Sequence, residues 1–499
     1  MNNFQQFFGR VGLFTIVAYL CSGIVYGQND TNKNRLDYHF SWDGKSSILK
    51  VELFYHTHNA DSTVFVFGNP NPGGLTNIFD ILVNPGIDHG DSLSVNTSDR
   101  KLVVRHNTQG VKKLNYEIDG TPVLDPKRAR PNEAFRPSIA PGFFYSLGYN
   151  LFMDVADSTF TDVTFVWDSW PEQMPYFVSL DPEAKPGHRQ MVAHAERNGV
   201  LIQMNQNLQR KKYDINKIPT YLITSKSGDG NDMQQGMDSL VARFIPGIRE
   251  FWQDYDFKFY FLSMIPLLTE VPSTMTGIGL NNGFGTRYSG PLDTEKMVTI
   301  AHEISHSWIG VRMGIKSKTM ENTWFSEGFN DYIAIYNLVR SGLFDQTAFL
   351  NYVNKEILRP HYTNPENKTP ADSIEMNFWK NKNFEKIPYH RGFIYALYLD
   401  HQIRLATNSK KGLRDFLLIL YNQNGKSKEK VLTVADFIEA LSAFLPKEQI
   451  ELEVKNYMHD GQLLDFRKIK LINSFLVNYD DQVPQISFSG KSDFSSFYK

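Results

Sequence analysis

Short runs of alternating hydrophobic and polar residues dominate the first two fifths of the chain. The runs 49–53, 101–105 and 163–167 place apolar residues at every second position or in a short β-branched stretch. Clusters of turn-forming residues separate such runs, and the strongest is the Asn-Pro-Asn-Pro-Gly-Gly segment at 69–74. A period of two over four to eight residues is typical of β-strands with one buried face. Residues 28–207 are therefore predicted to form a β-sandwich domain.

A mixed pattern replaces the strand pattern in the next part of the chain. Apolar runs at 221–224 and 257–265 have the composition of buried strands, and the run 237–255 between them has apolar residues three and four positions apart. That second spacing places apolar side chains on one face of an α-helix. Helical spacing returns after Pro291 and continues to about Met458.

These patterns together predict a multidomain α+β protein. We expect the β-sandwich to be followed by a mixed domain at 208–345 and by a helical C-terminal region at 346–475. The last segment, 476–499, is rich in Ser, Asp and Phe and has no clear period. We expect this segment to form a loosely packed tail.

The N-terminal segment has the pattern of an export signal. Arg10 precedes an almost uncharged apolar run at 11–25, and Gly27 lies just before a polar stretch. The run is shorter than the roughly 20 residues that a spanning helix needs, so a signal peptide over 1–27 fits better than an uncleaved anchor. The single cysteine, Cys21, would be removed with it. We therefore expect a periplasmic or secreted protein without disulfides and without stable membrane insertion.

The charge of the chain excludes one class of partner. The sequence has 52 Lys and Arg residues against 54 Asp and Glu residues, and its formal net charge is -2 at pH 7. A protein that binds nucleic acid usually has a basic stripe or patch, and no run rich in Lys or Arg is found in this sequence. Nucleic acid is therefore not an expected partner.

The strongest candidate chemistry is a His-Glu-Ile-Ser-His segment that begins at His302. It lies in a run with helical spacing, in which Gly310 and Gly314 are the expected stops. Because His302 and His306 are four residues apart, both imidazoles face one side of a helix and can bind one tetrahedral zinc ion. Glu303 lies one position around the helix, where its carboxylate can act as general base on a water molecule at the metal.

Two acidic residues lie one helical turn apart in a second predicted helix, which begins near Trp324 and ends near Gly342. Glu327 would be the third protein ligand and would leave the fourth position open, as a catalytic zinc site requires. Asp331 faces the same side and could accept the second ring N–H of a ligand histidine, which fixes the tautomer of that ring. The pattern therefore predicts one zinc ion per chain.

A tyrosine opens a third predicted helix. Tyr389 belongs to the segment Lys-Ile-Pro-Tyr-His-Arg-Gly-Phe. A tyrosine hydroxyl opposite the zinc can donate a hydrogen bond to the oxyanion that forms when water attacks a carbonyl. Since the chain has 24 tyrosines, only the context of Tyr389 makes it a candidate.

Together these motifs resemble the glycyl aminopeptidase family of gluzincin zinc metallopeptidases and, more distantly, the leukotriene hydrolase and aminopeptidase N group. The resemblance covers roughly residues 257–466 and rests on the order of HEISHSW, WFSEGFNDY and PYHRGF. It implies a thermolysin-like catalytic domain at 208–345 behind the β-rich domain. It also implies that His302, His306 and Glu327 are the zinc ligands. Glu303 would then be the general base, and Tyr389 the hydrogen-bond donor to the transition state.

One departure from the family concerns substrate binding. Relatives have a Gly-rich strand ahead of the zinc helix with a glutamate, usually followed by His or Asn, that binds the free amino group of the substrate. The corresponding segment here is 277–283, with Asn281 at the position of the acid. An amide cannot neutralise an ammonium ion, so the sequence does not predict strict aminopeptidase specificity. Backbone groups of Gly279, Leu280 and Asn281 could still bind an extended peptide by strand addition.

The predicted function is zinc-dependent hydrolysis of a peptide or protein substrate. Three alternatives remain open at this point: an endopeptidase instead of an aminopeptidase, a catalytically silent zinc-containing protein that binds peptides, and hydrolysis of an ester or epoxide on the same scaffold. The missing acid at Asn281 favours the silent protein. Glu303 and Tyr389 favour the enzyme, because a structural zinc site needs neither.

Overall fold

A computed structural model describes most of the chain. The described residues are 33–68, 79–87, 90–122, 136–156, 159–225, 234–268, 273–314, 322–378, 381–425, 431–490, 494 and 497–498. The predicted signal peptide and the predicted turn at 69–74 lie outside these residues. No helix in the described ranges has the length and apolar character needed to cross a membrane.

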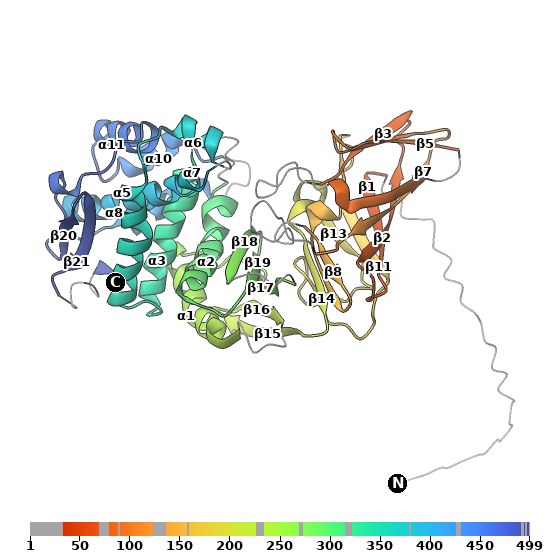
Figure 1. The fold of residues 1–499 in the computed structure, drawn as a ribbon, viewed down its shortest axis with the longest axis horizontal. Coiled ribbons are helices and arrows are strands. Elements are labelled where there is room, and N and C mark those ends of the chain that lie inside the picture. The colour runs from red at the N-terminus through yellow and green to blue at the C-terminus, as the bar shows by residue number, and fades with distance from the viewer. Residues whose placement is uncertain are drawn as a thin grey trace, which may run out of the picture.

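The N-terminal half is built from three β-sheets (Figure 1). The first is six-stranded, in the order β13 (Gln190–Ala193), β11 (Asp162–Ser169), β1 (Arg35–Ser41), β2 (Ile48–His56), β7 (Val111–Asp119) and β4 (Leu82–Ile87). The second has the order β10 (Asp154–Val155), β3 (Ser62–Val66), β6 (Lys101–Arg105) and β5 (Ser92–Asn96). The third has the order β12 (Tyr176–Val178), β14 (Leu201–Asn205), β9 (Phe143–Leu147) and β8 (Ser138–Ala140).

One apolar core joins these three sheets. In β2 the buried Val51 and Leu53 alternate with the exposed Lys50, as the period of two predicts. Phe65 of the second sheet and Met204 of the third belong to the same buried cluster. The prediction of a β-rich N-terminal half is therefore confirmed.

A five-stranded sheet lies in the middle of the molecule (Figure 1). Its order is β15 (Leu208–Ile215), β16 (Ile218–Ser225), β17 (Tyr260–Pro266), β19 (Gly283–Ser289) and β18 (Thr274–Leu280). β16, β17 and β19 are parallel, whereas β18 is antiparallel to β19 and forms the edge. The helix α1 (Gln234–Trp252) connects β16 to β17, so the predicted order of strand, helix and strand is confirmed.

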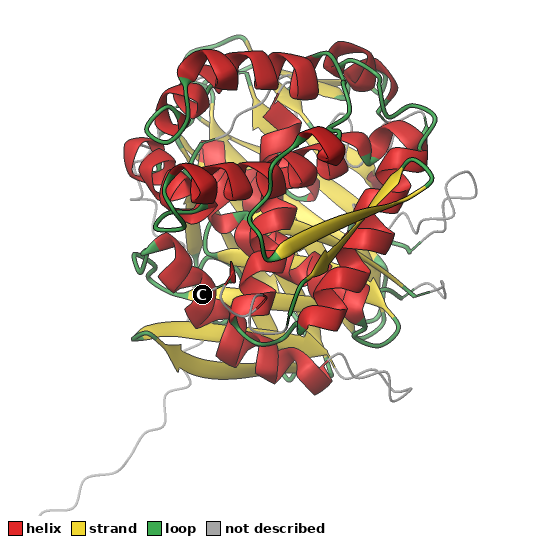
Figure 2. Cartoon of the chain, turned by 90° about the vertical axis from the view of Figure 1, so that its left-hand side faces the viewer, coloured by secondary structure: helices red, strands yellow, loops and turns green. Residues whose placement is uncertain are grey.

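Helices form most of the rest of the described chain, as Figure 2 shows. Three of them carry the candidate site: α2 (Thr294–Ser305), α3 (Asn330–Arg340) and α8 (Ile387–Ala406). The others are α4 (Gln346–Tyr352), α5 (Arg359–Thr363), α6 (Ala371–Asn377), α7 (Lys382–Glu385), α9 (Leu413–Asn424), α10 (Val434–Leu441) and α11 (Lys447–Glu453).

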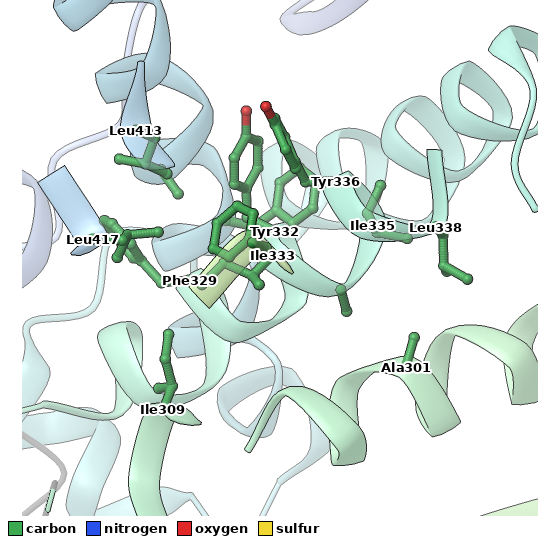
Figure 3. Packing of buried hydrophobic residues seen from close by; sticks show 14 of the residues in the cluster. Ala301, Ile309, Phe329, Tyr332, Ile333, Ile335, Tyr336, Leu338, Leu413 and Leu417 are labelled. Atoms are coloured by element: carbon green, nitrogen blue, oxygen red, sulfur yellow. The ribbon is translucent and has the colours of Figure 1, made fainter. Parts of the chain in front are cut away.

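α3 lies at the centre of the helical core. Figure 3 shows its residues among Ala301 of α2, Ile309 of the segment that follows α2, and Leu413 and Leu417 of α9. This single apolar cluster includes residues on both sides of position 345. The predicted domain boundary at that position stays a prediction.

The end of the chain is packed, which corrects the expectation of a loosely packed tail. β20 (Phe475–Asp480) and β21 (Val483–Phe488) form an antiparallel hairpin, and both Phe497 and Tyr498 are buried. Arg404 of α8 donates to the carbonyl oxygen of Phe497 at 2.8 Å and lies 4.3 Å from the centre of its ring. The aromatic residues of this segment contact the helical core from a hairpin and from the residues after it, so no single period marks them in the sequence.

Candidate metal centre

The last turn of α2 presents the residues of the His-Glu-Ile-Ser-His segment. His302 and Glu303 belong to the helix and His306 directly follows it. The chain then breaks from helical geometry at Gly310, whose φ is 109°, and Gly314 has a φ of 60°. Both expected stops therefore have the left-handed backbone that favours glycine.

Three side chains from two segments converge on one point. The Nε2 atoms of His302 and His306 are 2.9 Å apart, and Oε2 of Glu327 lies 3.3 Å from the first and 3.6 Å from the second. All three ligand atoms lie within 4.8 Å of one another. Tetrahedral zinc with bonds of about 2.0–2.1 Å needs ligand atoms roughly 3.3–3.4 Å apart. The donor set and its spacing therefore fit a zinc ion.

The tautomers of the two imidazoles point to a cation between them. Nδ1 of His302 lies 2.6 Å from the carboxylate of Asp331, and Nδ1 of His306 lies 3.1 Å from the carbonyl oxygen of Ile309. Both partners are acceptors, so each Nδ1 donates the hydrogen bond, and each Nε2 can bind a metal ion when that nitrogen is deprotonated. The break in the helix at Gly310 turns the carbonyl group of Ile309 toward the imidazole of His306. The expected position of Asp331 beside a ligand histidine is thus where the structure places it.

The electrostatics of this cluster favour positive charge. Burial alone would raise the pKa of Glu327, but His306 and His302 outweigh it and hold the pKa well below its usual value. Burial alone would lower the pKa of His302, yet Asp331 and Glu327 raise it well above its usual value. Two acids and two imidazoles in a low-dielectric pocket therefore stabilise a cation in the space that they share.

The carboxyl group of Glu303 lies against β18, an edge strand of the five-stranded sheet. Desolvation raises the pKa of its carboxyl group, although His302 and His306 oppose the shift. A Cβ atom added at Gly277 would lie 2.4 Å from Cγ and 2.6 Å from Oε1 of Glu303. The strand backbone is thus packed directly against the carboxyl group. The sequence placed Gly277 in the substrate-binding segment but did not reveal this contact.

Tyr389 lies beside the cluster in the first turn of α8. Its ring is nearly parallel to that of His302, with 6.1 Å between the ring centres. Desolvation raises the pKa of its phenol well above the usual value, and Glu327, Asp331 and Glu303 raise it further. The hydroxyl group therefore stays protonated and can donate a hydrogen bond.

Two glycines bring Tyr389 to the metal ligands. A Cβ atom at Gly328 would lie 2.5 Å from Cα of Gly392, and a Cβ atom at Gly392 would lie 1.9 Å from the carbonyl oxygen of Trp324. The helical turn 324–329 and α8 therefore cross backbone to backbone. Gly328 belongs to the motif WFSEGFNDY and Gly392 to the motif PYHRGF. Their positions next to Glu327 and Tyr389 were the only sign of this close crossing in the sequence.

Asn330 joins the two segments that carry the ligands. Its side chain is fully buried at the start of α3, and Nδ2 donates to the carbonyl oxygen of His302 at 2.8 Å. A carbonyl group near the end of a helix has few partners within that helix. The contact fixes the end of α2 relative to Glu327, and no sequence pattern indicated it.

The three predicted substrate-binding positions differ in their surroundings. A Cβ atom at Gly279 would lie 3.3 Å from Cβ of His306, so this residue is next to the cluster. Leu280 is buried among residues of the β-rich half, including Leu201. Asn281 follows β18 and is exposed in the turn to β19.

Comparisons with known proteins agree with this geometry. Residues 295–395 match the family of M61 glycyl aminopeptidases. Leucine aminopeptidase 2 from Aspergillus clavatus is 25% identical over 262 residues, which are 45% of this chain and 39% of that enzyme. Leucine aminopeptidase 2 from Emericella nidulans is 27% identical over 210 residues, or 37% of this chain and 33% of that enzyme. The chain thus spans well under half the length of the curated relatives it matches.

Solved structures share the fold over most of the chain. The aminopeptidase N family protein from Idiomarina loihiensis has a TM-score of 0.74 at 14% identity and covers 90% of this chain and 81% of its own. An M1 zinc metallopeptidase from Deinococcus radiodurans, solved with a Tyr-Ser-Ala substrate, has a TM-score of 0.51 at 15% identity. The match covers 87% of this chain and 94% of that chain. Yeast LTA4 hydrolase in complex with bestatin has a TM-score of 0.51 at 15% identity. The match covers 86% of this chain and 68% of that chain.

These matches confirm the resemblance and the fold class that the sequence predicted. The segment with the candidate ligands is similar to the M61 glycyl aminopeptidases. The β-rich half and the helical region after it are similar in fold to the aminopeptidase N family protein. The chain therefore has the scaffold of a zinc metallopeptidase, similar to M61 glycyl aminopeptidases across its zinc helices and to the aminopeptidase N group in its overall fold.

Proposed function

We propose that this chain is a zinc-dependent peptidase that binds one zinc ion through His302, His306 and Glu327. The observation that carries the proposal is the convergence of these three ligand atoms within 4.8 Å of one another. A fourth protein ligand is not among the described residues of this cluster, which leaves a position for water or substrate. Bound zinc would acidify a water molecule and polarise the carbonyl group that the water attacks.

Glu303 is the proposed general base and then general acid. Its carboxylate takes a proton from the attacking water and delivers that proton to the nitrogen of the leaving amine. The raised pKa of this carboxyl group supports the role, because a more basic carboxylate accepts the proton from water more readily.

Tyr389 is the proposed donor to the substrate carbonyl oxygen. As negative charge develops on that oxygen, the phenol O–H shortens its hydrogen bond and stabilises the charge. The stacking of its ring against His302 supports the role, because it holds the hydroxyl group at the metal centre.

We propose that the substrate is an extended peptide paired with β18. This strand is one of the two edges of the five-stranded sheet and lies along α2. The edge backbone can bind a peptide of any sequence, whereas Asn281 offers no charge to a free amino group. The chain would therefore cleave blocked as well as unblocked peptides. The tripeptide in the Deinococcus structure supports a peptide as the substrate class.

The test is peptide cleavage by the zinc-loaded protein and by two variants. Glu303→Gln is expected to keep zinc and to lower turnover by at least about 1,000-fold, whereas His306→Ala is expected to lose zinc and activity together. A chelator is expected to abolish cleavage, and added zinc to restore it. If the zinc-loaded wild type binds peptides but cleaves none, the chain is a silent binding protein and the proposal is wrong.

Export is a separate proposal that rests on the sequence of residues 1–27. The expected product in the native host is a protein in the periplasm or medium whose N-terminus lies near Gln28. Amino-terminal sequencing of the mature protein tests it, and a membrane-bound protein that retains the apolar run 11–25 would contradict it.

A further inference from the structure

A lysine stands over the ring of the proposed catalytic tyrosine. Nζ of Lys386 lies 4.6 Å from the centre of the Tyr389 ring, a distance at which a cation is attracted to the face of an aromatic ring. Lys386 itself is exposed. Among the described residues, no carboxylate lies within ion-pair distance of this ammonium group. The cation is thus held at the site without an acidic partner of its own.

The position of Lys386 is fixed relative to the metal ligands. It precedes α8 and lies three residues before Tyr389, so the two side chains lie on one face of the chain. The ring of Tyr389 in turn stacks on His302. Burial lowers the pKa of His390 to about 4, and Lys386 contributes to that shift. The charge of Lys386 therefore acts on a buried residue of the site, His390.

Two of the three acidic residues at the centre are paired with the imidazoles. Glu327 and Asp331 contact the two imidazoles, and Glu303 is packed against Gly277. The edge strand β18 contains no acidic residue, and the position predicted for an amine-binding acid is the neutral Asn281. Beside Tyr389 the described site therefore presents a cation, Lys386, without an ion-pair partner among the described residues.

We propose that Lys386 determines specificity by binding a carboxylate of the substrate close to the scissile bond. The inference rests on the proposed peptidase function and defines its substrate class as peptides that carry negative charge. The carboxylate could be an Asp or Glu side chain or the C-terminus of a short peptide, because both present the same two oxygens to an ammonium group.

The experiment compares matched peptides with the zinc-loaded full chain. One neutral parent peptide, blocked at both ends, is prepared with Glu or the isosteric Gln moved through successive positions. A second pair has the neutral parent sequence with either a free or an amidated C-terminus. For the wild type, kcat/KM is expected to be about 5- to 10-fold higher for the Glu peptide at one position, or for the free C-terminus, because an ion pair at a partly exposed site contributes about that much.

Variants assign the preference to Lys386. Lys386→Met is expected to bring the Glu to Gln ratio to about 1, and Lys386→Glu to invert it. Lys410→Met is the matched control, since Lys410 is exposed beyond the other end of α8 and is expected to keep the wild-type ratio. Dissociation constants of the same peptides for Glu303→Gln give a second readout that does not require turnover.

The outcomes separate this inference from the proposed function. If the wild type cleaves the Glu and Gln peptides equally at every position and the free and amidated pair equally, the inference is wrong while the peptidase stands. A preference that survives in Lys386→Met also overturns it. If no peptide is cleaved but Glu peptides bind more tightly through Lys386, the proposed hydrolysis is wrong while the carboxylate site stands.

Discussion

The contact between β18 and Glu303 gives the sharpest prediction for catalysis. Gly277→Ala would place a methyl group 2.4 Å from Cγ and 2.6 Å from Oε1 of Glu303. Ordinary contacts between such atoms are about 3.5–4.0 Å, so the strand and the carboxyl group must separate by roughly 1 Å. We expect the carboxyl group to move, because β18 is held by its full ladder to β19.

A displacement of this size is expected to lower kcat by about 100-fold, or roughly 2.7 kcal/mol of transition-state stabilisation. The zinc affinity should stay within about twofold of the wild type, because the atoms nearest to the new methyl group belong to Glu303 and not to a proposed metal ligand. The assay is kcat on a single peptide together with zinc content and thermal unfolding. Gly247→Ala is the matched control, since a Cβ atom there meets nothing within 4 Å.

A second substitution tests the cause of the effect. Glu303→Asp shortens the side chain and withdraws its carboxyl group from β18. In that background Gly277→Ala should lower kcat by less than about 10-fold, because two contacting residues are not additive. Wild-type kcat in a zinc-loaded Gly277→Ala protein would refute the account of how Glu303 is positioned.

Three further substitutions test other parts of the account. Asp331→Asn should weaken zinc binding by about 10- to 100-fold in competition with a chelator, because the carboxylate orients His302; an unchanged dissociation constant would show that the contact is dispensable. Tyr389→Phe should keep zinc and lower kcat by about 100- to 1,000-fold, and a smaller loss than tenfold would remove the phenol from the mechanism. Burial lowers the pKa of His401 to about 3, so between pH 6.5 and 3 the unfolded chain binds a proton that the folded chain does not bind. Through this residue the protein should lose about 5 kcal/mol of stability as the pH falls through that window. Urea unfolding of His401→Gln should show a shallower loss of stability over the same pH range, and identical pH profiles would contradict the assignment.

The convergence of the candidate ligands could be predicted from the sequence because their spacing is local. His302 and His306 are one helical turn apart, and Glu327 and Asp331 repeat that interval on the next helix, so each pair shares a face before any tertiary contact forms. The β-rich half was also predictable, because strands such as β2 alternate buried and exposed residues with a period of two.

The remaining features depend on contacts between distant segments. The closeness of Gly328 to Gly392 and of Gly277 to Glu303 is a property of packed backbones, and a glycine in a sequence does not reveal which atom lies beside it. The hairpin at the end of the chain was missed for the same reason. Its aromatic residues are buried by α8 and its neighbours, and their spacing along the chain has no period of its own.

The most direct test of the central claim is a crystal structure of the zinc-loaded protein with anomalous diffraction measured at the zinc edge. The account predicts one zinc peak per chain, within about 2.0–2.2 Å of Nε2 of His302, Nε2 of His306 and a carboxylate oxygen of Glu327. A zinc peak elsewhere, or none in protein that cleaves peptides, would contradict it.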